Sequence, residues 1–187
     1  MDDDERALIL KAQGGDQRAF ECLVSRYDRR VLGLACDMVG HPEDAQDVFQ
    51  ETFLAAYRAL PGFRMDSDFF TWLYRIAVNK ALTFRRSRAR RIAESADGNP
   101  TGHPPRTENG TATPEELVLQ AELGRQIESA LEGLSSQERM AFVLCHRQGF
   151  KVRQAALFMS CSEGAVKSYL FRAREKMKSA LCKYTET

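Results

Sequence analysis

The chain has 187 residues and a formal net charge of +1, with 27 Lys and Arg against 26 Asp and Glu. Its composition, 43% hydrophobic and 28% charged, is ordinary for a globular protein and argues against wholesale disorder. No stretch approaches the roughly 18 apolar residues of a membrane helix, and the acidic start is unlike that of a signal peptide. We therefore expect a cytoplasmic protein without direct membrane insertion.

The distribution of reactive side chains argues against a catalytic or metal site. The five cysteines are scattered and form no CxxC pair, so neither a disulfide framework nor a zinc knuckle is expected. The three histidines are dispersed, and no nucleophile or phosphate-loop motif is present. We expect no cofactor, no metal, no catalytic residue and no small-molecule substrate, and hence no enzyme.

The near-zero net charge averages over acidic and basic segments. Residues 70–91 contain seven Arg or Lys and no acidic residue, and residues 145–187 carry a net charge of +6, whereas residues 1–69 carry −6. Two separate basic segments suggest two contacts with a polyanion, because phosphate neutralisation supplies most non-specific nucleic-acid affinity. The alternative for either segment is a solvated helix face.

In chain order, the first clear element is a helix with an apolar stripe from Ala45 to Leu60 that would face a core and that includes Tyr57. Its opposite face carries Asp47, Gln50, Glu51, Leu54 and Arg58. Leu54 is out of place on this polar face. Such an exception can mark a partner surface, although isolated exposed leucines are common.

An aromatic and basic segment follows. Residues 63–68 lack a helical stripe and are expected to form a loop. Trp72, Arg75 and Asn79 then fall on one face of the next helix. Aromatic rings beside cations suit unstacked bases, which stack on such rings. Some of the rings must belong to the core instead, and Phe69 or its neighbour is a candidate for that role.

Residues 93–113 are rich in Gly, Pro, Asn, Thr and Ser and have Ala as their only hydrophobic residue, which is typical of a flexible linker. This linker divides a domain of residues 1–92 from a domain of residues 114–187, both of plausible size for small helical domains. The apolar periodicity is helical on both sides. The predicted fold is therefore all-α, with two small helical domains.

The C-terminal domain carries a helix-turn-helix pattern. Capping signals at Thr113 and at Ser135 begin two helices. A short helix at about 151–159, a break at 160–162 and a long basic helix from residue 163 to about residue 183 follow, which is the order of a DNA-binding helix-turn-helix.

The long basic helix is expected to present polar and basic side chains outward. Ser162 would cap it, and its exposed side chains would be Lys167, Ser168, Phe171, Arg172 and Arg174. A helix in the major groove presents its N-terminal side chains to base edges, while Arg and Lys further along reach phosphates. Phe171 suits contact with a thymine methyl, and the alternative is that it packs on the preceding helices.

Three motifs carry a resemblance to a known family. Residues 42–53 read PEDAQDVFQETF, residues 69–79 read FFTWLYRIAVN, and GAVKS at residues 164–168 is followed by FRAR at residues 171–174. With these motifs the chain, from about residue 15 to 182, resembles a bacterial sigma factor of the sigma-70 family, extracytoplasmic-function (ECF) group. The resemblance implies a subunit that binds core RNA polymerase, directs it to promoters and initiates transcription.

The resemblance also implies a role for each surface. The polymerase clamp helices of the largest subunit would bind a face made of Asp44, Asp47, Gln50, Glu51 and Leu54, and the flap would be a second polymerase contact. The single-stranded -10 element would be held by Phe63, Arg64, Asp66, Phe69, Trp72, Arg75, Asn79 and Lys80. The double-stranded -35 element would be read by Arg153, Ser162, Lys167, Ser168, Phe171, Arg172 and Arg174. An anti-sigma factor would regulate the protein.

The chain departs from the family pattern at Ser160, where a turn glycine is usual, and at Cys145, where a phosphate-binding arginine is common. A second reading of the same residues is a stand-alone helix-turn-helix repressor or activator whose N-terminal helices form a dimer. The aromatic and basic face around Trp72 discriminates between the two, because a protein that binds only duplex DNA has no use for a single-strand platform.

Overall fold

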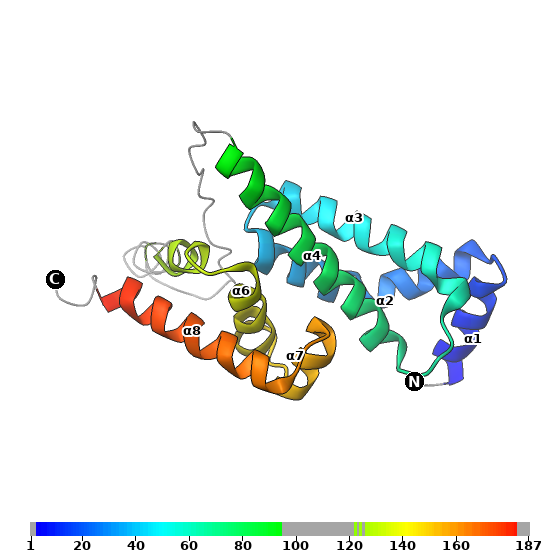
Figure 1. The fold of residues 1–187 in the computed structure, drawn as a ribbon. Coiled ribbons are helices and arrows are strands. Elements are labelled where there is room, and N and C mark those ends of the chain that lie inside the picture. Colours follow the sequence, from blue (N-terminus) through cyan, green and yellow to red (C-terminus); the bar gives the residue numbers. More distant parts are fainter. Residues whose placement is uncertain (1–2, 95–121, 123, 125, 183–187) are drawn as a thin grey trace, which may run out of the picture.

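The computed structural model describes residues 3–94, 122, 124 and 126–182, and every regular element in these ranges is a helix (Figure 1). The all-α prediction is therefore confirmed. None of the described helices is both long and apolar enough to cross a membrane. The capping signal expected at Thr113 and all but the first two residues of the expected linker lie outside the described residues.

The N-terminal half forms four helices and a short turn. They are α1 (Asp3–Gln13), α2 (Gln17–Val39), α3 (Pro42–Ala59), the 3-10 turn η1 (Leu60–Gly62) and α4 (Phe69–Glu94). The Asp16 side chain caps α2 by accepting a hydrogen bond of 3.1 Å from the Ala19 amide. Gly40 ends the same helix in the left-handed conformation, with φ 77°. Pro42 then begins α3 at a position where its missing N–H costs nothing.

The segment expected to be a loop, residues 63–68, has no regular helix, as predicted. It ends at Asp68, whose carboxylate accepts hydrogen bonds from the Thr71 amide at 2.8 Å and the Thr71 hydroxyl at 2.7 Å. These bonds fix the start of α4. The helix then runs without interruption through the arginine-rich stretch to Glu94, two residues beyond the expected domain boundary.

The C-terminal half contains a helical stretch at residues 126–132 and four further elements. They are α6 (Ser136–Phe142), the π-helical turn η2 (Val143–Arg147), α7 (Val152–Met159) and α8 (Glu163–Cys182). The Ser135 hydroxyl accepts a bond from the Glu138 amide, and the Glu138 carboxylate accepts one from the Ser135 amide. This capping box was predicted and is confirmed.

The helix-turn-helix also follows the prediction. Ser160 takes the left-handed conformation, with φ 52°, and ends α7. The Ser162 hydroxyl accepts a bond of 3.1 Å from the Ala165 amide and so caps α8. Serine thus occupies a backbone conformation that glycine adopts without strain, which explains why a turn glycine is common at this position.

The two halves pack against each other. Helix α4 contacts α6 and α7, and α2 contacts η2 (Figure 1). Tyr74 of α4 is fully buried, and its ring lies 5.3 Å from that of Phe150 and 4.9 Å from that of Phe158. The described residues therefore form one main hydrophobic core that draws on both halves.

Glu138 links the start of α6 to α8, and its charge should contribute to stability. Its carboxylate accepts hydrogen bonds from Arg172 at 3.1 Å and Lys176 at 2.7 Å. Burial alone would raise the pKa of Glu138, but the bonds from Lys176 and Ser135 outweigh it and lower the pKa from 4.5 to about 2.

Because the pKa of Glu138 is lowered on folding, its charge stabilises the protein above pH 4.5, and that contribution is lost as the pH falls from 4.5 toward 2. The full contribution is about 3 kcal/mol at 1.36 kcal/mol per pKa unit. Glu138→Gln keeps the capping oxygen and removes the charge. In urea unfolding, the variant should be less stable than the wild type at pH 7, and the deficit should be less than half as large at pH 3, where the unfolded chain is protonated but the folded carboxyl is still mostly ionised. An equal deficit at both values would contradict this assignment.

Candidate functional site

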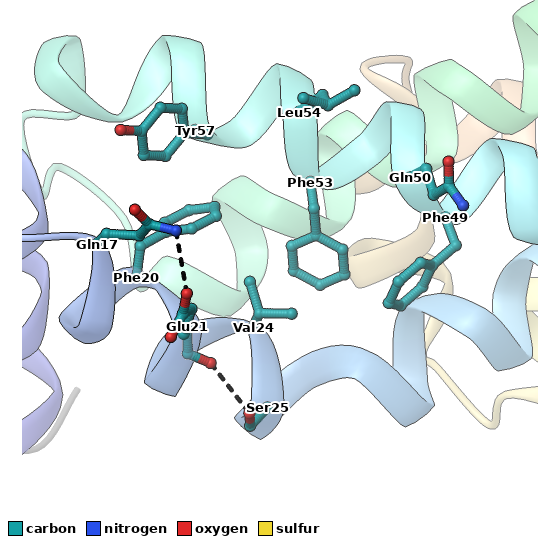
Figure 2. A pocket seen from close by; sticks show the side chains of 10 residues that line it. All are labelled: Gln17, Phe20, Glu21, Val24, Ser25, Phe49, Gln50, Phe53, Leu54 and Tyr57. Atoms are coloured by element: carbon teal, nitrogen blue, oxygen red, sulfur yellow. Dashed lines mark hydrogen bonds between the residues drawn. The ribbon is translucent and has the colours of Figure 1, made fainter.

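An open apolar groove of about 670 Å³ lies between α2 and α3 (Figure 2). Phe20, Val24, Phe49 and Phe53 line its floor, and Leu54 and Tyr57 stand at its edge with 49% and 46% of their surface exposed. Polar side chains complete the rim: Gln17, Glu21, Ser25 and Gln50. The rings of Phe20 and Tyr57 pack edge to face at 5.0 Å, which holds the rim in place. We call this feature the α2/α3 groove.

The five residues assigned to polymerase binding lie along α3 on either side of one ridge. Gln50 and Leu54 face the α2/α3 groove. Asp47 and Glu51 face a smaller hollow of about 230 Å³ between α3 and α4. Asp44 is paired with Arg88 at 2.7 Å. The exposed ridge of α3 therefore combines apolar groove residues on one flank with carboxylates on the other.

The sequence did not lead us to predict all of the residues that line this groove. Tyr57 was assigned to the buried stripe of α3, and this assignment is wrong: its ring lines the open groove between α2 and α3 and is 46% exposed. The groove residues of α2, among them Phe20 and Val24, were not proposed at all. Their apolar spacing signals an amphipathic helix, but only the packing of α2 on α3 shows that part of that face stays open.

The aromatic cluster before α4 is mostly core. Phe63 is 7% exposed and Phe69 is 1% exposed, so neither ring presents a face on which a base could stack. The assignment of these two side chains to -10 binding is therefore corrected. The centroids of their rings lie 4.8 Å and 5.5 Å from that of the Trp72 ring, so both rings pack against the Trp72 side chain. Trp72 itself is half-buried.

The remaining candidates of this face are polar and accessible. Arg64, Asp66 and Asn79 are exposed, and Lys80 pairs with Glu51 at 2.8 Å. The hydrogen bond from Lys80 lowers the pKa of Glu51. Arg75 is also exposed and donates a hydrogen bond of 3.3 Å to the Ser160 hydroxyl in the turn of the helix-turn-helix. The accessible part of the predicted face is thus cationic, with Trp72 as its aromatic member.

Helix α8 presents the side chains that were expected on its outer face. Lys167, Ser168 and Arg174 are exposed, and Phe171 is 66% exposed. The alternative in which Phe171 packs on the preceding helices is therefore wrong. Arg153 of α7 and Ser162 at the cap are exposed as well. Arg172 differs from the others because its guanidinium is paired with the Glu138 carboxylate of α6 at 3.1 Å.

Comparison with known proteins identifies this combination of domains. The family model for sigma-70 region 2 matches residues 23–91, which span α2 to α4. The model for sigma-70 region 4 matches residues 124–177, which span the helix-turn-helix. The chain belongs to the sigma-70 family. Because sigma factors are non-catalytic initiation subunits, this membership confirms the expectation that the protein is not an enzyme.

Curated relatives place the chain within the ECF group. It is 38% identical over 183 residues to the RNA polymerase sigma-H factor of Pseudomonas aeruginosa, covering 95% of this chain and 93% of that protein. It is 40% identical over 177 residues to the ECF RNA polymerase sigma-E factor of Escherichia coli K12, covering 91% of each. The protein is an ECF-type sigma factor, and the reading as a stand-alone repressor or activator is set aside.

Two solved structures are similar to this chain in fold. A structure of CnrH in complex with the cytosolic domain of CnrY is 31% identical, with a TM-score of 0.64, and the match covers 97% of this chain and 99% of that one. A structure of the sigma factor RpoE from Bartonella quintana, in complex with the anti-sigma factor NepR, is 24% identical with the same TM-score and shows likeness of fold. We refer below to residues 3–94 as region 2 and to residues 126–182 as region 4.

The contrast between buried and exposed aromatic rings can be tested by paired substitutions. Phe63→Ala should lower the free energy of unfolding by about 3 kcal/mol, because it leaves a cavity under Trp72. Phe171→Ala should change it by less than about 0.5 kcal/mol, because the ring is largely exposed. Urea unfolding measures both. A similar loss in the two variants would contradict the burial described above.

Proposed function

We propose that this sigma factor binds core RNA polymerase through the α2/α3 groove and the ridge of α3, and that it does so in the cytoplasm. The observation that carries the proposal is the exposed pair Leu54 and Tyr57 on an open apolar groove beside the carboxylates of Asp47 and Glu51. Such a surface suits an amphipathic partner helix with an apolar ridge and basic flanks. The clamp helices of the largest polymerase subunit would supply that ridge, and the flap would contact region 4.

The DNA-binding part of the proposal divides the promoter between the two regions. Region 2 would hold the single-stranded -10 element with Trp72, Arg75, Asn79 and Lys80, together with Arg64 and Asp66 of the preceding loop. One aromatic platform beside several cations suits unstacked bases, each worth about 1–3 kcal/mol when stacked. Region 4 would read the duplex at -35 through the N-terminal half of α8, with Arg153 and Arg174 at the phosphates.

We also propose regulation by an anti-sigma factor. The structure of RpoE contains a sigma factor with a bound anti-sigma factor, NepR, and CnrH is in complex with the cytosolic domain of CnrY. In this chain the α2/α3 groove offers an open apolar surface, and an inhibitor that covers it would compete directly with polymerase.

Polymerase binding can be tested with a single charge in the groove. Leu54→Arg should weaken capture by core polymerase about tenfold or more and abolish run-off transcription, because an unpaired guanidinium would be forced against the apolar partner surface. Leu10→Arg is the matched control, since Leu10 is 54% exposed on α1 and does not line the groove. Equal capture of both variants would remove the groove from the polymerase interface.

The division of the promoter can be tested with two exposed side chains. Asn79→Ala should slow strand opening, measured by permanganate reactivity at the -10 element, and leave binding to the closed duplex nearly unchanged. Lys167→Ala should weaken closed-duplex binding and reduce its salt dependence by about one counterion. If both variants lost only duplex affinity, region 2 would not act on the single strand.

A further inference from the structure

A histidine of the π-helical turn η2 contacts a cation of α8. The Arg174 guanidinium lies 3.3 Å from His146 Nε2, and both residues are exposed. An arginine side chain has donors only, so the imidazole accepts this hydrogen bond through a nitrogen that carries no proton. The ring of Phe142 in α6 packs against the imidazole at a centroid distance of 4.8 Å. We call the two polar side chains the His146–Arg174 pair.

The pair lies on the face of α8 that the proposed function gives to the duplex. Lys167, Phe171 and Arg174 are exposed and follow one another at helical spacing, so they share one side of the helix. Arg172 projects from the opposite side, where the Glu138 carboxylate pairs with it at 3.1 Å. Arg174 donates to an uncharged imidazole instead. Its positive charge is therefore available to a phosphate.

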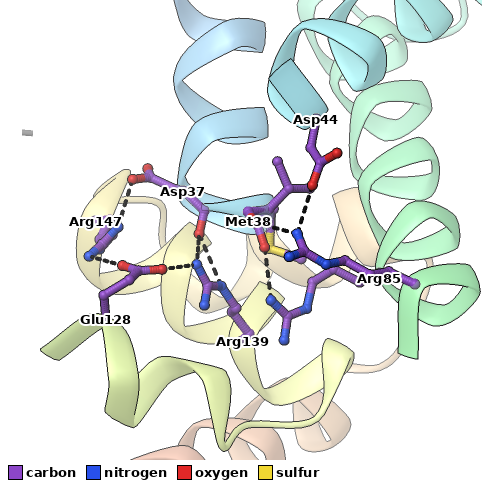
Figure 3. Close-up of polar contacts among 9 residues, drawn as sticks. Asp37, Met38, Asp44, Arg85, Glu128, Arg139 and Arg147 are labelled. Atoms are coloured by element: carbon purple, nitrogen blue, oxygen red, sulfur yellow. Dashed lines mark hydrogen bonds and ion pairs between the residues drawn. The ribbon is translucent and has the colours of Figure 1, made fainter. Parts of the chain in front are cut away.

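The charge nearest to His146 opposes its protonation. Burial lowers the pKa of the imidazole, and the charge of Arg174 lowers it further. The acids that lie close to η2 are already paired, because Arg147 binds Asp37 of α2 at 2.9 Å and Glu128 at 3.3 Å (Figure 3). These carboxylates do not offset the charge of Arg174 at the imidazole.

The other titratable groups of the neighbouring elements do not favour protonation either. Burial raises the pKa of the Cys145 thiol, so this group stays uncharged beside the pair. Helix α7 has Arg153 as its charged residue, which is a cation like Arg174. In the free protein the imidazole therefore stays neutral at pH 7 and serves as an acceptor.

A backbone phosphate at the pair would reverse this balance. The phosphate would accept hydrogen bonds from the Arg174 guanidinium and leave His146 Nε2 without its donor. This nitrogen could then take a proton from the solvent and donate it in a hydrogen bond to another oxygen of the same phosphate. Because the negative charge favours the imidazolium, DNA binding would raise the pKa of His146. By linkage, the affinity for DNA would then rise as the pH falls.

We propose that His146 is a further DNA-contacting residue of this sigma factor: with Arg174 it binds one backbone phosphate of the -35 duplex and takes up a proton as it does so. The role in DNA binding rests on the proposed function, whereas the pairing of the two side chains in the free protein does not. The -35 contact of this chain is then stronger at mildly acidic pH.

Duplex binding at two pH values tests the proposal. Core polymerase reconstituted with the full chain is titrated, by fluorescence anisotropy, against a duplex that carries the -35 element and ends upstream of the -10 element. From about pH 8 to about pH 6, the affinity of the wild type should rise at least about threefold more than that of His146→Gln. Glutamine keeps a hydrogen-bonding side chain but takes up no proton in this range.

His41→Gln is the matched control, because it makes the same change at the N-cap of α3 in region 2. This variant should keep the pH dependence of the wild type. An equal pH dependence in the two glutamine variants would overturn the proposal.

An NMR titration of the imidazole in the full chain without polymerase is the second test. Arg174→Gln should raise the pKa of His146, because it removes a charge that lowers this pKa. Addition of the same duplex to the wild type should raise it as well, and no change on adding the duplex would overturn the proposal. A wild type without preference for the -35 element would refute the proposed function, and the DNA contact of His146 with it. The titration of the free chain would still show whether the two side chains are paired.

Discussion

The arrangement of this sigma factor depends on the need to provide hydrogen-bond donors for the last backbone carbonyls of α2. The last carbonyls of a helix have no partner within it, and here they lie at the junction of two domains, where leaving them unpaired would be costly. Three arginines provide the donors. Arg139 bonds to the Asp37 carbonyl, Arg85 to the Met38 carbonyl at 3.0 Å, and Arg88 to the Val39 carbonyl at 3.5 Å. Only Arg139 comes from region 4, so completing this helix end also joins the two regions.

This use of arginine changes the meaning of the basic segment in α4. By composition alone, the five arginines between Arg85 and Arg91 appear as one polyanion-binding block. In the structure Arg85 is largely internal, and its pKa is lowered to about 10, first by burial and then by the nearby charge of Arg139. Arg88 donates hydrogen bonds to the Val39 carbonyl and to the Asp44 carboxylate. The charge available to DNA is therefore smaller than the count suggests, since part of it holds the protein together.

Local rules predicted the elements of this fold well, and they failed where the outcome depends on packing between elements. The cap at Ser135 and the cap at Ser162 depend on residues close in sequence, and both were predicted. The burial of Phe63 depends on how the loop of residues 63–68 folds under Trp72, and the junction at Tyr74 depends on region 4, which is distant in sequence. Periodicity places an aromatic residue on a helix face, but it cannot say which partner covers that face.

Glu138 shows how one side chain can serve both the fold and recognition. Its carboxylate is 5% exposed and holds two cations of α8, Arg172 and Lys176, which are themselves about half exposed. For Arg172 to reach a base edge it must leave this carboxylate. Lys176, bonded to the other oxygen at 2.7 Å, stays behind and keeps the charge of Glu138 paired. Because a buried carboxylate is costly only when it loses all of its partners, the second cation lowers the free energy needed to free Arg172 for DNA.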